Sequence, residues 1–223
     1  MHETPIRHIA VIARGVAGDP RDAAAAVAGA LRHAAAIADE AFAAAPGLRA
    51  FSFFAPDVDR LLDDPDGAAE ARHGCVEGTG ALEAAAARLG ASLRTCGRVD
   101  GLPPEVMRHA APAHPAPAER TLLLFLRYGG REEIARAASR LLVARPGSSL
   151  GDDDLDAWLD TAGVPDPDLV VLAGGAFEAP DAFVWQGSYA ELWHTETPWA
   201  AFTVGELQVA LSDFGARQRR FGK

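Results

Sequence analysis

Continuous apolar runs are the feature that most constrains how this chain can fold. Leu169–Ala173 (LVVLA) is such a run and is followed at once by Gly174 and Gly175. Thr121–Arg127 (TLLLFLR) and His8–Ala13 (HIAVIA) are two more. Strands that are apolar at every position, rather than at alternate positions, are typical of parallel sheets with both faces covered. Glycines after such a strand let backbone approach a ligand closely, so the end of 169–173 is a candidate binding site.

Helix-like and strand-like segments alternate along the rest of the chain. Further strands are expected at Leu48–Phe54 and Ala91–Cys96, and a sixth at Phe183–Trp185. Alanine content and helical spacing predict helices at Ala23–Ala45, Glu83–Leu89, Arg131–Ala144, Asp152–Thr161 and Val204–Arg220. The acidic stretch Asp57–Gly80 predicts a loop with a short helical patch. This alternation predicts an α/β fold: a single domain over residues 1–223, with a mainly parallel six-stranded sheet flanked by helices.

The bulk composition narrows the classes of function. The chain has 223 residues, 49% hydrophobic content and a formal net charge of −10. Binding to nucleic acid depends on basic surface, so we expect no nucleic-acid partner for this acidic chain. The two cysteines lack metal-like spacing, and no apolar run approaches the roughly 20 residues that span a bilayer. These features predict a cytoplasmic protein with at most peripheral membrane contact.

Four motifs occur in a fixed order along the chain. HIAVIARG begins at His8, LRYGGREEI at Leu126 and RQRRFG at Arg217. The longest string runs from PDPDL at Pro165 through the glycine pair to WQGSYAELW, which begins at Trp185. Together these strings resemble those of the cis-prenyltransferases, the undecaprenyl diphosphate synthase family. The resemblance implies that family's fold and its reaction, which joins an allylic diphosphate to isopentenyl diphosphate.

The departures from the family pattern fall on the residues that handle the diphosphates. Arg14 stands where the family has the aspartate that binds Mg²⁺, and a guanidinium cannot bind a cation. Leu172 replaces an arginine that holds isopentenyl diphosphate, and Glu178 and Asp181 stand where the family has R-x-S-N. Only Glu191 matches a family acid linked to Mg²⁺. We therefore expect no metal cofactor, unless a partner subunit or a bound diphosphate supplies Mg²⁺.

The resemblance still assigns residues to the site. The substrate-binding candidates are Arg14, Gly15, Ser52, Gly174 and Gly175. If catalysis remains, the candidates for it are Arg14, Glu178, Asp181 and Glu191. We expect Glu191 to form a salt bridge with Arg14, the alternative being a surface acid on a short loop. His8 is expected to begin a strand rather than to bind a metal.

Two functional hypotheses follow. In the first, the chain is a catalytically silent accessory subunit that pairs with an active cis-prenyltransferase, or with itself. The dimer interface would then include Trp185, Ser188, Tyr189, Glu191 and Trp193, and Arg220 and Gly222 would enter the partner's active site. The simpler reading of Arg220 is a basic helix end. In the second hypothesis, the chain is a repurposed enzyme that binds a prenyl diphosphate and joins it to another acceptor or cyclises it.

Overall fold

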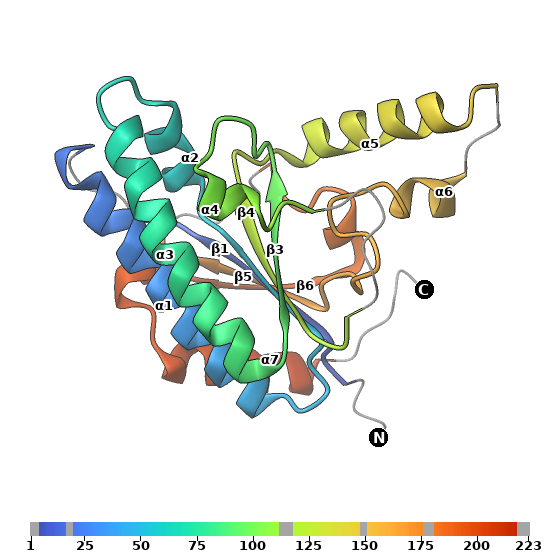
Figure 1. The fold of residues 1–223 in the computed structure, drawn as a ribbon. Helices are drawn as coiled ribbons and strands as arrows, with labels where there is room; N and C mark the ends of the chain where they lie inside the picture. Colours follow the sequence, from blue (N-terminus) through green and yellow to red (C-terminus); the bar gives the residue numbers. More distant parts are fainter. Residues whose placement is uncertain (1–4, 17–19, 112–117, 148–150, 176–180, 218–223) are drawn as a thin grey trace.

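The computed structural model describes residues 5–16, 20–111, 118–147, 151–175 and 181–217. Six strands form one sheet in the order β3-β4-β2-β1-β5-β6, and all five pairings are parallel (Figure 1). The strands are β1 His8–Ala13, β2 Ala50–Phe54, β3 Ser92–Gly97, β4 Thr121–Leu126, β5 Leu169–Ala173 and β6 Glu191–Thr195. The predicted α/β architecture with a six-stranded parallel sheet is therefore confirmed.

The predicted sixth strand was misplaced. Segment 183–185 is not a strand: Phe183 is buried with a φ of 52°, and a 3-10 turn follows at Gln186–Tyr189. The sixth strand is instead β6, which pairs with β5 from Leu169↔Glu191 to Ala173↔Thr195. Its side chains are only partly buried because β6 is an edge strand, so its sequence lacks the apolar run that identified the central strands.

Helices flank the sheet, and those on one face cover it, as Figure 1 shows. Three helices pack on one face: α1 Ala23–Ala44, α3 Ala68–Leu89 and α7 Val204–Ala216. On the other side lie α5 Gly130–Ala144 and α6 Asp152–Asp156. The short helices α2 Pro56–Asp63 and α4 Pro104–Met107 follow β2 and β3. Within the described residues, no helix is long and apolar enough to cross a membrane.

The acidic stretch 57–80 is helical rather than a loop. Pro56 occupies the first turn of α2, with Asp57 and Asp59 beside it, which is a favourable N-terminal composition. The long helix α3 begins at Ala68. The sequence pattern hid this helix because its buried face includes glycine at positions 74 and 78. The expected helix 152–161 is correspondingly shorter and ends at Asp156.

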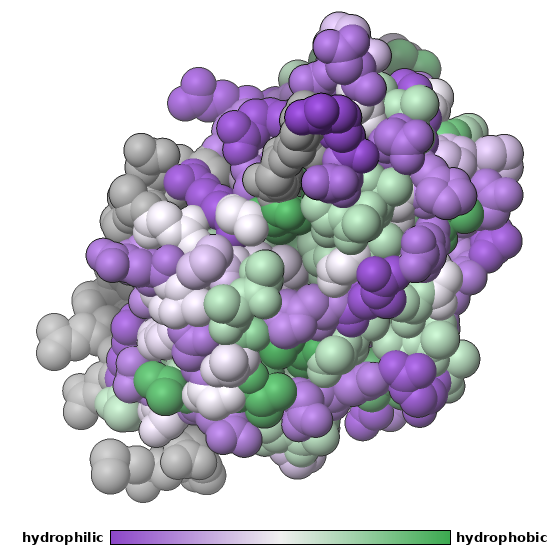
Figure 2. Space-filling model, turned by 90° about the vertical axis from the view of Figure 1, so that its left-hand side faces the viewer, coloured by the Kyte–Doolittle hydropathy of each residue, from purple (hydrophilic) through white to green (hydrophobic). Residues whose placement is uncertain are grey.

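Two small residues let α1 and α3 approach to backbone contact. A Cβ atom added to Gly74 would lie 2.4 Å from the carbonyl oxygen of Ala24. A Cβ atom added to Gly78 would lie 2.5 Å from Cβ of Leu31. Real Cβ atoms do not approach other atoms so closely, so these glycines are required by packing. The two helices therefore form one unit that covers the sheet from the side seen in Figure 2, where polar and apolar residues are intermixed.

Candidate functional site at the carboxyl ends of the strands

The loop after β1 is held by backbone contacts from two other segments. Arg14 N donates to the carbonyl of Ala173 at 2.8 Å, and Trp199 N donates to the carbonyl of Arg14 at 2.9 Å. Gly15 follows with a φ of 73°, and a Cβ atom on it would lie 2.9 Å from Cβ of Pro198. The backbone of Arg14 and Gly15 is thus fixed between the end of β5 and the Pro198 turn.

The glycine pair after β5 lies against the same loop. Gly174 has a φ of 82°, and a Cβ atom there would lie 2.5 Å from the carbonyl oxygen of Arg14. Gly175 has a φ of 114°, and His194 Nε2 lies 2.6 Å from its carbonyl oxygen. A cavity of only about 10 Å³ is lined here by Ile12, Arg14, Leu172, Ala173, Gly174, Gly175 and His194. That volume suits about one water molecule. The structure therefore brings together Arg14, Gly15, Gly174 and Gly175.

Asp57 of α2 binds the backbone of the loop after β1. Its Oδ2 accepts hydrogen bonds from Gly15 N at 2.7 Å and from Val16 N at 3.1 Å. Asp57 is buried, and Arg60 on the same helix forms an ion pair with its other oxygen. A carboxylate that accepts hydrogen bonds from two backbone N–H groups and from a guanidinium is held firmly in one position.

Asp59 makes the same kind of contact at the end of β4. Its two carboxylate oxygens accept from Arg127 N at 2.5 Å and from Tyr128 N at 2.9 Å. Arg127 has a φ of 49°, which is rare for a residue other than glycine. Burial raises the pKa of Asp59 to about 7, even though the two amide bonds favour the charged form. Helix α2 thus places one carboxylate at each of two strand ends.

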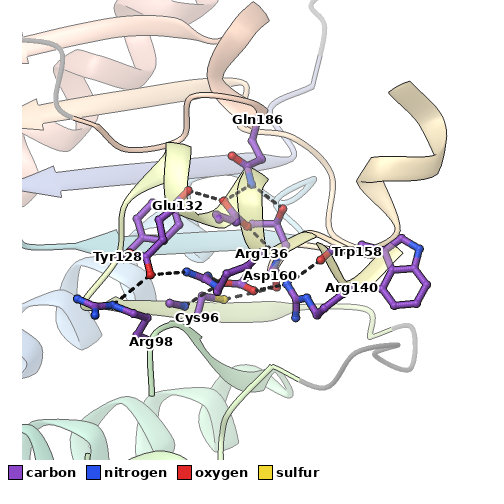
Figure 3. A network of polar contacts seen from close by, with 12 residues as sticks. Cys96, Arg98, Tyr128, Glu132, Arg136, Arg140, Trp158, Asp160 and Gln186 are labelled. Atoms are coloured by element: carbon purple, nitrogen blue, oxygen red, sulfur yellow. Dashed lines mark hydrogen bonds and ion pairs between the residues drawn. The ribbon is translucent and has the colours of Figure 1, made fainter. Parts of the chain in front are cut away.

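A buried polar network, drawn in Figure 3, connects α5 to the segments that follow β4 and β5. Glu133 is fully buried and accepts from the Tyr128 hydroxyl at 2.6 Å, from Gln186 Nε2 at 3.0 Å and from Asp160 N at 2.8 Å. The Asp160 carboxylate in turn pairs with Arg136 at 2.6 Å. Burial raises the pKa of Glu133, and the donors from Gln186 and Tyr128 oppose that shift. The network holds Gln186 inside the molecule, so this part of the WQGSY motif is structural.

Two of the expected site residues lie elsewhere. Ser52 is buried in the middle of β2, where its hydroxyl lies 2.8 Å from His8 Nε2. Glu191 begins β6 and is level with Ile9, whereas Arg14 follows the last residue of β1. Five residues of parallel strand separate those levels, or roughly 16 Å. The expected salt bridge between Glu191 and Arg14 is therefore wrong, and Glu191 pairs with Arg217 at 2.9 Å instead.

The remaining candidates have separate positions. His8 begins β1, as expected, and is buried. Asp181 lies at the start of α5, where its carboxylate accepts from Arg131 N at 3.1 Å and its carbonyl from Gly130 N at 2.9 Å. It therefore caps a helix. Glu178, Arg220 and Gly222 lie outside the described residues.

The residues assigned to an interface gather around β6. Tyr189 and Leu192 expose 68% and 41% of their surface, and Ser188 is also exposed. Trp193 is half-buried and its Nε1 donates to Asp213 of α7 at 3.0 Å. Trp185 donates to Asp156 at 2.5 Å. Trp193 thus ties the edge strand to α7 and Trp185 ties its own segment to α6, while Tyr189 and Leu192 offer apolar surface.

Comparison with known proteins decides the family. The family model described as "Putative undecaprenyl diphosphate synthase" matches residues 75–222. The chain belongs to this family. The match begins within α3, so the positions of Arg14 and Asp57 lie outside it.

Two solved structures of the same fold cover nearly the whole chain. They are a probable undecaprenyl diphosphate synthase from Campylobacter jejuni (TM-score 0.69, 24% identity, 99% of this chain and 100% of that one) and the lavandulyl diphosphate synthase of Lavandula x intermedia in complex with dimethylallyl diphosphate (TM-score 0.77, 19% identity, 98% of each).

Curated relatives carry the name isoprenyl transferase. The Wolinella succinogenes protein is 42% identical over 102 residues, which is 46% of this chain and 44% of that protein. The Rhodopirellula baltica protein is 38% identical over 138 residues, 58% of this chain and 57% of that one. The chain thus spans about half the length of the curated relatives that it matches.

The described residues of this family member do not fit a Mg²⁺ site at the end of β1. Mg²⁺ takes oxygen ligands in an octahedral arrangement. Here the position carries Arg14, and the neighbouring Asp57 is engaged by two amides and Arg60. Glu191 lies at the amino-terminal ends of the strands, whereas Arg14 lies at their carboxyl ends. Among the residues that the structure describes, no group of three or more His, Cys, Asp or Glu side chains is placed to hold a metal.

Sequence reasoning missed both carboxylates of α2. The string Pro56-Asp57-Val58-Asp59 follows a strand and resembles a helix start, which was the available signal. The acidic composition of the stretch that follows predicts a loop instead, and the backbone amides that these carboxylates bind belong to segments about 40 and 70 residues away in the sequence.

Proposed function

We propose that this chain is a non-catalytic member of the undecaprenyl diphosphate synthase family that pairs with an active member and supports its polyprenyl diphosphate synthesis. The observation that supports this proposal most directly is the place of Arg14 at the junction of β1 and β5. Its Cδ lies 3.9 Å from the point that a Cβ atom on Gly175 would occupy. A positive charge at this point repels Mg²⁺. The family reaction, which joins an allylic diphosphate to isopentenyl diphosphate, therefore lacks its metal in this chain.

The neighbouring contacts support the same proposal. Glu191, the acid that matches the family position linked to Mg²⁺, lies at the amino-terminal ends of the strands, away from the loop after β1. Asp57 is already bonded to the amides of Gly15 and Val16. Neither carboxylate is available to replace the missing metal ligand. The scaffold itself, with its complete parallel sheet, remains suited to assembly.

The partner would bind at the β6 edge. Tyr189 and Leu192 present apolar surface beside the edge strand, and the partly buried Trp193 and Glu191 are anchored to α7 and Arg217 beneath it. An edge strand with exposed apolar side chains is a natural assembly surface. The occupant that we propose is a second family member, either an active relative or another copy of this chain.

The direct test measures turnover. The purified chain alone, given farnesyl diphosphate, isopentenyl diphosphate and Mg²⁺, should give no elongated product, while an active family member from the same organism serves as positive control. Co-expression of the two should yield a complex whose turnover exceeds that of the partner alone. Clear elongation by the isolated chain would overturn the proposal.

The same preparation tests the alternative, a repurposed enzyme. Arg14 could meet a prenyl diphosphate directly through its guanidinium, since arginine binds phosphate oxygens well. Tight binding of a prenyl diphosphate by the chain alone, lost in Arg14→Ala, would favour that alternative.

For the accessory subunit we further propose that Arg220 and Gly222 reach the partner's diphosphate site. Arg220→Ala should then lower the partner's turnover by roughly ten- to a hundredfold without loss of assembly.

A further inference from the structure

Helix α2 occupies two backbone sites of the same design. At the end of β1, Gly15 has a φ of 73°, and its N–H and that of Val16 both point at Asp57 Oδ2. At the end of β4, Arg127 has a φ of 49°, and its N–H and that of Tyr128 point at the two oxygens of Asp59. In each case two successive amides, the first belonging to a residue with positive φ, converge on one carboxylate.

Such paired amides are general anion receptors. Successive N–H groups around a residue of left-handed conformation form a concavity that binds phosphate and carboxylate oxygens. The strands β1 and β4 lie on either side of β2, and α2 follows β2 directly. Asp57 and Asp59 are two residues apart and enter the two concavities from one short helix. Val58, Leu61 and Leu62 are buried and anchor that helix to the core.

We propose that α2 is an internal substitute for a bound anion: the Asp57 carboxylate fills the Gly15–Val16 amide pair and keeps anions of the phosphate class out of it. This contact orders the loop after β1 without a ligand. It is self-inhibitory because it prevents anion binding at those amides. Asp57 carries the contact because its Oδ2 alone satisfies both amides, while its second oxygen is held by Arg60. This inference does not rest on the proposed function, because it concerns anion binding and not turnover or assembly.

The experiment is a chemical rescue followed by thermal unfolding. Asp57→Ala leaves the two amides without their acceptor, and its Tm should fall by about 5 °C. Inorganic pyrophosphate at millimolar concentration should restore at least half of that loss, because it can occupy the vacated amide pair. The wild-type Tm should move by less than about 1 °C under the same conditions, since its own carboxylate excludes the anion.

Two controls separate the contact from general effects. Asp66→Ala removes the same charge from an exposed position just beyond α2, and pyrophosphate should not raise its Tm more than that of the wild type. Sodium chloride at equal ionic strength should not rescue Asp57→Ala. If the alanine variant does not fold, Asp57→Ser, whose short side chain also leaves the amide pair vacant, undergoes the same titration. Equal stabilisation of wild type and variant by pyrophosphate, or no stabilisation of either Asp57 variant, would overturn the inference.

Discussion

At the scale of single residues, His8 shows how a residue can match a family motif and yet serve the fold. Its imidazole is completely buried, with Nδ1 2.6 Å from the carbonyl of Pro165 and Nε2 2.8 Å from Ser52 Oγ. Burial lowers the pKa of His8 to about 4, against the smaller opposite effects of the Pro165 carbonyl and Asp168. The neutral ring therefore joins β1, β2 and the segment before β5.

The pKa of His8 predicts acid sensitivity. Because the folded pKa lies below the unfolded value of 6.5, the unfolded chain binds more protons between pH 6.5 and 4, and stability falls as the pH drops through that window. Relative to His8→Gln, which cannot titrate, the wild type should lose on the order of 2–3 kcal/mol between pH 7 and 4.5. Urea unfolding of both proteins across this range measures the difference. Parallel curves would contradict the prediction.

A second residue-scale prediction concerns the Glu133 network. Tyr128→Phe removes the hydroxyl that donates to Glu133 and should lower the unfolding free energy by about 1–3 kcal/mol, because the buried carboxyl loses a hydrogen-bond donor. Pairing this change with Glu133→Gln in a double-mutant cycle isolates the contact. An interaction energy near zero would mean that the hydroxyl and the carboxyl are energetically independent.

At the scale of elements, the contact of α1 with α3 depends on two glycines, and a third glycine on α3 serves as the control position. Gly74→Ala or Gly78→Ala should destabilise the fold by about 1–3 kcal/mol, because a methyl group would meet Ala24 or Leu31. Gly80 lies on the same helix, exposed, with nothing within 4 Å of its added Cβ. Gly80→Ala should therefore stabilise the protein by about 0.5–1 kcal/mol through helix propensity. Chemical denaturation of the three variants decides whether packing or propensity governs each site.

Helix α2 carries a pH response of opposite sign to that of His8. Asp59 has its pKa raised from 3.8 to about 7, so the folded chain binds the extra proton and stability falls as the pH rises from about 4 to 7. Asp63 on the same helix, Arg127 after β4 and the Cys75 thiol of α3 are the titratable and charged groups that act on it.

The test compares wild type with Asp59→Asn. Between pH 5 and 8 the wild type should lose about 2 kcal/mol relative to this variant, whose side chain stays neutral. Asp66→Asn, at an exposed position, should follow the wild-type curve. Identical pH profiles for wild type and Asp59→Asn would show that the two amide bonds keep Asp59 ionised throughout.

At the scale of the whole molecule, the β6 edge should decide assembly. Leu192→Asp places a charge on the exposed apolar surface of the edge strand and should abolish co-purification with a family partner while leaving the monomer folded. Val143→Asp is the matched control, because Val143 is 84% exposed on the distant helix α5. Size-exclusion chromatography of the co-expressed pairs provides the readout. Equal loss of assembly in both variants, or in neither, would place the interface elsewhere.

The sequence by itself determined the local features of this protein. The apolar runs located the central strands, with β5 at the predicted bounds, because a strand buried on both faces must be apolar at every position. The motif strings identified the family, and the carboxyl ends of β1 and β5 met as parallel strands require, so Arg14 and the glycine pair lie together.

Only the tertiary structure decided the relations between distant segments. Glu191 stands at the amino-terminal edge because β6 runs parallel to β5, and no local pattern marks that half-buried edge strand. Gly74 and Gly78 mimic a loop in sequence, yet they lie at a helix contact that exists only when α1 is in place. The partners of Asp57 are amides, which every sequence position carries, so only the folded backbone could select those of Gly15 and Val16.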